Sequence, residues 1–213
     1  MTVKVTSLLT RKSNIIIPDI TNNSVKIINE FFIIPAVFSL SLLRSLRIVE
    51  VLLKAVEMAQ KDQIKALCSM PINKQVLQDG ADFPYAGHTE FFAAISGSKQ
   101  TVMMLVCPKL KVVPATIHIP LAQVALKLSA INLEEIIKIT HRALRDYFLV
   151  EKPRISIAGL NPHAGENGKF GNEEEKLIEP VIKKLRKQGF CVTGPLSADS
   201  MFHKNARERY DVA

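Results

Sequence analysis

A short apolar run that breaks into a polar, glycine-spaced loop constrains this chain more than any other stretch. Residues 155–171 have the sequence ISIAGLNPHAGENGKFG, which predicts a strand over Ile155–Leu160 and then a loop with Asn161, His163 and Glu166. The loop glycines recur at every third position, at Gly165, Gly168 and Gly171. Because glycine lacks a Cβ, backbone can approach a ligand closely here. We expect the strand to deliver this loop to the carboxyl edge of a sheet, where open α/β folds bind ligands. A plain surface turn with an incidental histidine is the alternative.

Helix-like and strand-like segments alternate along the rest of the chain. Apolar residues with a helical period predict helices over Arg44–Lys61, Leu121–Ala130, Leu133–Leu149 and Glu173–Gln188. The expected apolar face of the first helix consists of Leu46, Val49, Leu52, Leu53 and Val56. Apolar runs predict strands over Ile64–Met70, Thr101–Cys107, Lys111–Ile119 and Cys191–Thr193, and Tyr210–Ala213 resembles the start of another. This alternation predicts an α/β fold with helices flanking a sheet.

Residues 1–43 contain no glycine, since the first glycine of the chain is Gly80. They therefore cannot hold a GxGxxG or P-loop phosphate cradle. A short strand at Ile15–Ile17 and a strand or helix at Val25–Ile34 are the elements we expect there. We divide the chain into an N-terminal segment, residues 1–43, and a partial α/β domain, residues 44–213.

The charge of the chain favours an anionic partner. The formal net charge of the 213 residues is +8 and the isoelectric point is about 9.4, which fits a phosphorylated metabolite or, less specifically, nucleic acid. The basic residues are spread out, and the chain has no tryptophan. An aromatic-studded groove for single strands is therefore not indicated, and we expect no nucleic-acid partner.

The cysteines and the apolar runs indicate a cytoplasmic protein. Cys68, Cys107 and Cys191 lie far apart in strand-like runs without a CxxC pair, and we expect buried free thiols in a reducing compartment. The apolar run Phe31–Leu43 contains a proline and is too short to span a bilayer. We therefore expect no membrane partner.

Three histidines, His88, His118 and His163, stand at the ends of predicted elements beside glycine or proline. Neutral imidazoles are good ligands for zinc and related ions, but the spacing matches no local motif such as HExxH. A metal site would therefore have to be assembled by the fold. His88 and Thr89 lie at a loop-to-helix junction, where free amides favour an anion. The alternatives are a helix-capping role for His88 and a half-buried strand position for His118.

Several long motifs occur in an order that resembles a known family. They are SMPINK at Ser69–Lys74, GHTEFFA at Gly87–Ala93, ATIHIPL at Ala115–Leu121, GLNPHAGENGKFGNEE at Gly159–Glu174 and GPLSADSMF at Gly194–Phe202. Together they are similar to the 4-hydroxythreonine-4-phosphate dehydrogenases of pyridoxal 5'-phosphate (vitamin B6) biosynthesis. The resemblance runs from about Leu43 to the end of the chain.

The resemblance implies a homodimeric enzyme with an isocitrate/isopropylmalate-dehydrogenase-like sheet and flanking helices. It implies oxidation of 4-phosphohydroxy-L-threonine by NAD (or NADP), then decarboxylation, assisted by a divalent metal: zinc, magnesium or cobalt. By motif match, His118 and His163 correspond to two of three metal-binding histidines. His88 and Thr89 correspond to the substrate-binding pair, and Lys74 is expected near the same cleft. Asn161 and Glu166 share the His163 loop and are expected to support the metal histidines. No catalytic acid or base is assigned.

The chain departs from the family pattern at both ends. A GDPxGIG-type segment is absent from residues 1–43, and Ala213 precedes the YHDQG-like motif that carries the third metal histidine. Most of the NAD site is expected beyond it. We therefore expect a family member shortened at both ends. The alternatives are a chain that binds metal or phosphate without turnover, a dehydrogenase of threonate or erythronate phosphate, and a basic nucleic-acid-binding module.

Overall fold

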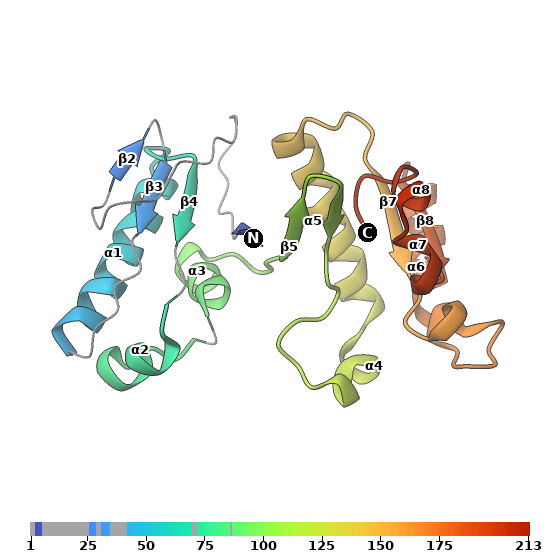
Figure 1. Cartoon of the computed structure of the whole chain (residues 1–213), viewed down its shortest axis with the longest axis horizontal. Coiled ribbons are helices and arrows are strands. Elements are labelled where there is room, and N and C mark those ends of the chain that lie inside the picture. The colour runs from blue at the N-terminus through green and yellow to red at the C-terminus, as the bar shows by residue number, and fades with distance from the viewer. Residues whose placement is uncertain (1–2, 6–25, 29–30, 35–41, 70–71, 86) are drawn as a thin grey trace. The chain divides into compact units, whose positions relative to one another are not determined.

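The computed structural model describes residues 3–5, 26–28, 31–34, 42–69, 72–85 and 87–213 (Figure 1). They form two compact units, one within Val5–Met103 and one made of Met104–Ala213 with Met1–Lys4. Both units combine helices with small sheets, so the predicted mixed α/β class is confirmed. The predicted boundary between residues 43 and 44 lies within the helix Leu42–Gln60, and the division of the chain at that point stays a prediction.

The described residues of the Val5–Met103 unit form a small sheet and three helices. Its strands are β2 (Lys26–Ile28), β3 (Phe31–Ile34) and β4 (Ala66–Ser69), and its helices are α1 (Leu42–Gln60), α2 (Lys74–Ala81) and α3 (His88–Ser96). β3 pairs antiparallel with β2 and parallel with β4. The described residues of Val25–Ile34 are strand rather than helix, but they form two antiparallel strands instead of one element. Ile15–Ile17 lies outside the described residues.

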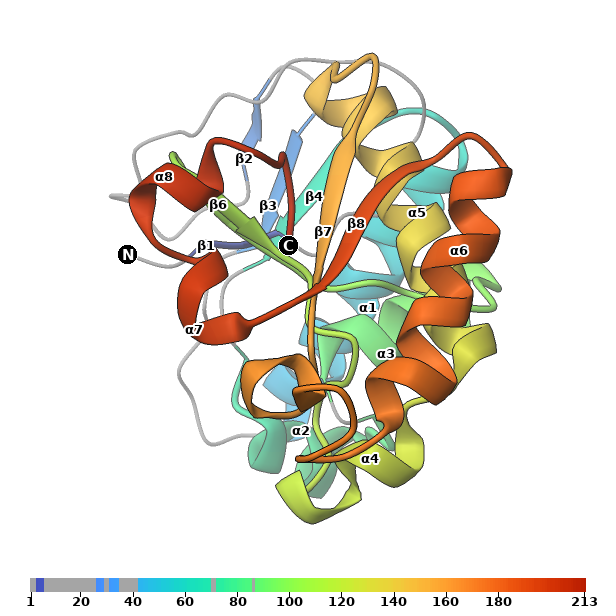
Figure 2. The same ribbon diagram turned by 90° about the vertical axis from the view of Figure 1, so that its right-hand side faces the viewer.

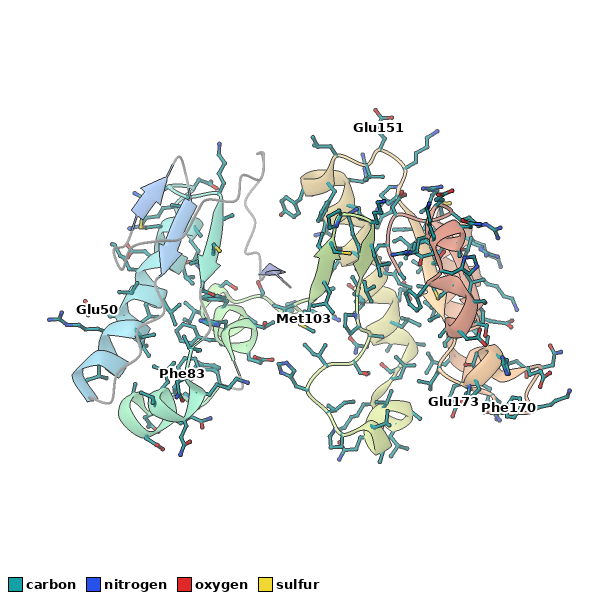
Figure 3. The ribbon with its side chains drawn as sticks, viewed as in Figure 1. Glu50, Phe83, Met103, Glu151, Phe170 and Glu173 are labelled. Atoms are coloured by element: carbon teal, nitrogen blue, oxygen red, sulfur yellow. The ribbon has the colours of Figure 1, made fainter. Side chains whose placement is uncertain are left out.

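The core of this unit lies among its three helices. Leu52, Val56, Leu77, Phe83 and Phe91 are almost fully buried in one cluster, and Figure 3 labels Phe83. On α1 the buried residues follow the i, i+3, i+4, i+7 pattern of one helical face, at Leu52, Ala55, Val56 and Ala59. Leu46 and Leu53 fall off this stripe and are exposed, contrary to the predicted face.

The second unit contains the remaining elements. Its strands are β1 (Val3–Val5), β5 (Met104–Cys107), β6 (Leu110–Val112), β7 (Arg154–Ala158) and β8 (Cys191–Leu196). Its α-helices are α4 (Val124–Lys127), α5 (Ala130–Phe148), α6 (Glu179–Lys187), α7 (Ala198–Met201) and α8 (Lys204–Arg207). Shorter turns are η1 (Leu121–Gln123), η2 (Pro162–Gly165) and the π-helical turn η3 (Glu174–Ile178). β5 and β6 form an antiparallel hairpin, and β7 pairs parallel with β8.

The last residues of the chain join β6 to β7, as Figure 2 shows by the position of the C-terminus. The Val212 N–H donates to the Arg154 carbonyl (3.4 Å), and the Val212 carbonyl accepts from the Ser156 N–H (3.0 Å). On the other side, the Ala213 N–H donates to the Lys111 carbonyl (3.0 Å), and the Ala213 carbonyl accepts from the Val113 N–H (2.8 Å). Both patterns are those of parallel pairing. Tyr210–Ala213 does not form the predicted strand, because Val212 makes only an isolated parallel bridge with Ile155. What is present is a short paired segment, residues 211–213, which we call the terminal segment.

This pairing gives β6, β7 and β8 one common direction. Each strand therefore ends at the same edge of the sheet, and the segments that follow them leave from that edge. The His118 segment follows β6, the His163 loop follows β7, and α7 follows β8. The carboxyl edge predicted for the His163 loop thus exists in this unit.

Helices α5 and α6 cover one face of the β7–β8 pair and supply its core (Figure 2). Leu144, Leu185, Val192 and Val212 are almost fully buried in this cluster. Arg154 also binds the terminal segment through its side chain: its Nη2 donates to Asp211 Oδ1 (2.9 Å) and its Nε to Asp211 Oδ2 (3.3 Å). Backbone hydrogen bonds, apolar burial and a bidentate ion pair therefore hold the terminal segment together.

The three cysteines are free, as predicted, but their side chains are exposed rather than buried. Successive residues of a strand point to opposite faces, so Leu67 and Val192 take the inward positions and their neighbours Cys68 and Cys191 face outward. Within the described residues, no helix combines the length and apolar character needed to cross a membrane.

Candidate metal and substrate site

The loop after β7 has an unusual backbone. All six residues from His163 to Gly168 have positive φ, with values from 42° to 87°. Left-handed backbone costs a non-glycine residue about 1–2 kcal/mol, and it normally occurs at single positions. Four of the six residues are not glycine: His163, Ala164, Glu166 and Asn167. Such strain persists only when the surroundings impose it, and it is concentrated at functional sites.

Two carboxylates from the start of the next helix bind Asn161, which lies just before this stretch. The Asn161 backbone N–H donates to Glu174 Oε1 (2.7 Å), and Asn161 Nδ2 donates to Glu174 Oε2 (2.9 Å) and Glu173 Oε2 (2.7 Å). Glu174 is only 4% exposed. The two ends of the loop are thus tied together, and we call Asn161, Glu173 and Glu174 the loop clamp. Figure 3 shows Glu173 and Phe170 on this part of the chain.

Close packing within the chain requires glycine at Gly159 and Gly165. A Cβ on Gly165 would lie 2.7 Å from Glu174 Oε2, and a Cβ on Gly159 would lie 2.6 Å from Ala164 Cα. Both distances are too short for real atoms, so any larger residue would push the loop away from Glu174. The close approach observed here is to the chain itself, and the predicted approach to a ligand stays a prediction.

The clamp also shifts the acidity of its carboxyl groups. Burial raises the pKa of Glu174, but the hydrogen bonds from Asn161 outweigh it and hold that pKa below its ordinary value. The Asn161 side chain likewise lowers the pKa of Glu173. Both residues are therefore ionised acceptors at neutral pH, and charge-assisted hydrogen bonds are stronger than neutral ones.

The clamp presents His163 at the surface, beside α7. His163 Nδ1 lies 3.2 Å from Asp199 Oδ2, and both side chains are more than half exposed. Ser197 Oγ donates to the other oxygen, Asp199 Oδ1, at 2.7 Å. The Ser197 hydrogen bond is the largest cause of a lowered Asp199 pKa, and His163 adds to it. Phe170 packs edge-on against the His163 ring, with centroids 6.2 Å apart.

His118 does not end a strand, contrary to the predicted strand Lys111–Ile119. β6 stops at Val112, and Pro114 soon follows without an N–H to donate to a ladder. His118 lies farther along, with φ 57° and an exposed side chain. It still follows β6, whose carboxyl end shares an edge with that of β7. Whether the rings of His118 and His163 converge on one ion stays a prediction.

His88 and Thr89 open helix α3 as predicted, after Gly87 as N-cap. The His88 ring stacks on Phe92, with centroids 5.6 Å apart and planes at 25°. Lys74 reaches this junction, since its Nζ lies 3.9 Å from the position of a Cβ on Gly87. These residues belong to the Val5–Met103 unit, whereas His118 and His163 belong to the other. A cleft shared by the two pairs stays a prediction.

The described residues supply only some of the ligands that a metal ion needs. Two imidazoles follow parallel strands, and one of them has a carboxylate on its Nδ1, which leaves Nε2 available. Catalytic zinc usually has three protein ligands. No group of three or more His, Cys, Asp or Glu side chains with metal-binding geometry occurs within the described residues. The histidines therefore fit a divalent ion chemically but need a further ligand.

A cavity of about 320 Å³ lies elsewhere on the second unit and contains none of the predicted site residues. It is lined by Lys138, His141, Arg142, Arg145, Asp146 and Phe190. Lys138 is paired with Glu134 (2.7 Å), and Asp146 adds a negative charge, so the basic side chains are partly compensated. Burial, followed by the Arg145 charge, lowers the pKa of His141. We assign no site to it.

Sequence interpretation missed Glu173, Glu174 and Asp199. The two glutamates were placed only at the start of the predicted helix Glu173–Gln188, and Asp199 had no predicted role. Asn161 was expected to support the metal histidines directly, yet its side chain binds the two glutamates. Glu166 instead approaches Lys169, at 3.8 Å. The signal available in the sequence was that all these residues lie within two of the long motifs, Gly159–Glu174 and Gly194–Phe202.

Comparison with known proteins gives a consistent result. A family described as "Pyridoxal phosphate biosynthetic protein PdxA" matches residues 16–213. The 4-hydroxythreonine-4-phosphate dehydrogenase of Paracoccus denitrificans (strain Pd 1222) is 49% identical over 170 residues, which cover 78% of this chain and 53% of the relative. A relative from Oceanobacillus iheyensis with a provisional name, D-threonate 4-phosphate dehydrogenase, is 40% identical over 164 residues, covering 76% and 49% of the two chains.

Solved structures agree with these matches. A crystal structure of 4-hydroxythreonine-4-phosphate dehydrogenase from Klebsiella pneumoniae superimposes with a TM-score of 0.76 at 34% identity, covering 82% of this chain and 52% of that one. The chain thus spans about half the length of the relatives it matches.

Proposed function

This chain belongs to the PdxA family of pyridoxal phosphate biosynthetic proteins, and we propose that it supplies the substrate- and metal-binding part of a 4-hydroxythreonine-4-phosphate dehydrogenase. The observation that carries the proposal is the common edge of β6, β7 and β8, where the segments bearing His118 and His163 leave the sheet. The identity to curated dehydrogenases supports the same reaction. The full sheet would be isocitrate/isopropylmalate-dehydrogenase-like, with helices on both faces.

The proposed reaction oxidises the secondary hydroxyl of 4-phosphohydroxy-L-threonine, with the hydride passing to NAD or NADP and the carboxylate leaving as carbon dioxide. A divalent metal would supply Lewis acidity at the hydroxyl oxygen. His118 and His163 would hold it, with a third ligand from outside the described residues. Val212 runs parallel to β7, so a motif following Ala213 would emerge at the same edge.

His88, Thr89 and Lys74 would bind the anionic substrate. His88 and Thr89 are the first residues of α3, and helix N-termini attract phosphate and carboxylate groups. Lys74 brings a positive charge to the same junction. The net charge of +8 also favours an anionic ligand.

Binding and turnover of the 213-residue polypeptide test this proposal separately. We expect zinc binding that is lost in His163→Ala, and stabilisation by 4-phosphohydroxy-L-threonine that is lost in His88→Ala. His203→Ala, at an exposed histidine that caps α8, should change neither. We expect no nicotinamide reduction by this polypeptide alone, because its described residues contain no group of three or more metal-binding side chains. Turnover at the usual ~1–10³ s⁻¹ would contradict that expectation. Equal metal binding by His163→Ala and the parent would refute the metal assignment.

The substrate has a second candidate. The relative from Oceanobacillus iheyensis carries a provisional assignment to D-threonate 4-phosphate, which shares the phosphate and the secondary hydroxyl but lacks the amino group. Comparing stabilisation by the two compounds decides between them. A preference for the threonate would favour the second candidate.

We also propose that the protein is a homodimer, with contacts from the segment after the His118 motif. Leu121, Leu126 and Ile131 are 80–88% exposed there, and exposed apolar clusters mark interaction surfaces. Leu126→Asp should therefore shift the polypeptide toward monomer in sedimentation velocity. Leu149→Asp makes the same chemical change at a residue that is 77% exposed on another part of the unit, and it should not. A parent chain that sediments as a monomer would contradict the proposal.

A further inference from the structure

We propose that Asp199, held by Ser197, is a positioning residue that fixes the ring orientation and tautomer of His163, so that Nε2 is the atom presented to the metal. The inference rests on the proposed metal role of His163 and assigns a function to the motif that follows β8. Asp199 itself touches neither metal nor substrate in this assignment.

The geometry carries the proposal. Asp199 Oδ2 lies 3.2 Å from His163 Nδ1, within reach of an Nδ1–H donor. Ser197 Oγ donates to Asp199 Oδ1 at 2.7 Å, which holds the carboxylate in place. Metal-ligating histidines generally donate their second ring N–H to a carboxylate, which fixes the tautomer and raises the basicity of the ligating nitrogen. The order Ser197, Asp199, His163 reproduces that arrangement.

The contact between His163 and Asp199 follows from the parallel pairing of β7 with β8. β7 and β8 are parallel neighbours, so the loop that bears His163 and the helix that bears Asp199 leave side by side. The strained backbone of the clamped loop fixes the position from which the His163 side chain projects. The Asp199 carboxylate then fixes the rotation of the ring. The ring would otherwise be free to rotate, because 61% of the His163 side chain is exposed.

Because Asp199 is exposed, a positioning role can be distinguished experimentally from a contribution to folding stability. An ion pair between two exposed side chains contributes little to folding, because water and salt screen it. The Asp199 side chain is 59% exposed. Removing its carboxylate should therefore leave the unfolding midpoint nearly unchanged while changing the His163 ring. A purely structural Asp199 would show the opposite pattern.

The first test uses metal-free protein. Nitrogen-resolved NMR of the parent polypeptide should show His163 mainly as the Nδ1–H tautomer when neutral. Asp199→Ala should shift it toward Nε2–H, the form that free histidine prefers in water. Asp199→Asn keeps an acceptor oxygen and should recover part of the parent spectrum. An unchanged His163 spectrum in Asp199→Ala would overturn the proposal whatever the metal does.

The second test titrates zinc by competition with a chelator. Asp199→Ala should weaken binding about 10–100-fold, the usual effect of losing such a partner, Ser197→Ala should weaken it less, and Asp146→Ala should not weaken it. If His163→Ala abolishes binding but Asp199→Ala does not weaken it, this inference fails and the metal assignment stands. If His163→Ala leaves zinc affinity unchanged, the metal assignment fails, and the tautomer result alone then decides whether Asp199 orients the ring.

Discussion

Val212→Asp is expected to unfold the second unit or leave it only marginally stable. Val212 is completely buried, in the terminal segment that joins β6 to β7. An unpaired buried charge costs about 3–5 kcal/mol, which is comparable with the whole stability of many domains, about 5–15 kcal/mol. Val212→Ala loses only apolar burial and packing, and it should cost about 2 kcal/mol.

Amide hydrogen exchange gives the sharpest measurement of this effect. The Ser156 and Val113 amides donate to the Val212 and Ala213 carbonyls, so both should lose protection in Val212→Asp. Leu149→Asp makes the same kind of change at an exposed residue, and it should cost no more than about 0.5–1 kcal/mol. If Val212→Asp and Leu149→Asp unfold at the same urea concentration, the prediction is wrong and the terminal segment does not stabilise the second unit.

Glu174→Ala is expected to destabilise the second unit by about 2–4 kcal/mol and to release the His163 loop. The buried Glu174 carboxylate accepts from the Asn161 backbone and side chain, at 2.7 and 2.9 Å. Removing it leaves the backbone donor without its acceptor and removes the contact that offsets the left-handed backbone. In Glu174→Ala, zinc affinity and folding stability should therefore fall together. In Asp199→Ala, only the zinc affinity should fall.

Urea unfolding followed by far-UV circular dichroism measures the loss. Glu175→Ala is the matched control, because Glu175 lies in the same turn but is exposed, and it should cost less than about 0.5 kcal/mol. The pKa of Glu174 is lowered in the folded state, so its stabilisation is present above its ordinary pKa of 4.5 and is lost as the pH falls through the folded pKa. The gap between the parent and Glu174→Gln should therefore close in acid. A gap that persists there would contradict an ionised clamp.

Local patterns in the sequence predicted most of the elements correctly. A helical period depends only on residues three and four apart, so α1, α5 and α6 could be predicted to within a few residues. Gly189 ends the α6 segment with positive φ, as a helix-ending glycine should. The order of the long motifs was sufficient to indicate the family, because it does not depend on three-dimensional contacts. The same local rules placed His88 at the start of α3.

Contacts between distant residues depended on the tertiary structure. Nothing local distinguishes Glu174 from Glu175, yet only Glu174 is buried, because only it meets Asn161 across the loop. Asp199 acquires its partner only because β7 and β8 lie side by side.

The terminal segment combines a local and a tertiary contribution. The apolar character of Tyr210–Ala213 predicted a strand, and the structure contains a single bridge at Val212 with flanking backbone hydrogen bonds. Its place between β6 and β7 could not be predicted, because strand pairing joins residues remote in sequence and backbone hydrogen bonds are the same for every residue type. That pairing sets the common direction of the strands, and with it the edge at which the segments bearing His118, His163 and Asp199 leave the sheet.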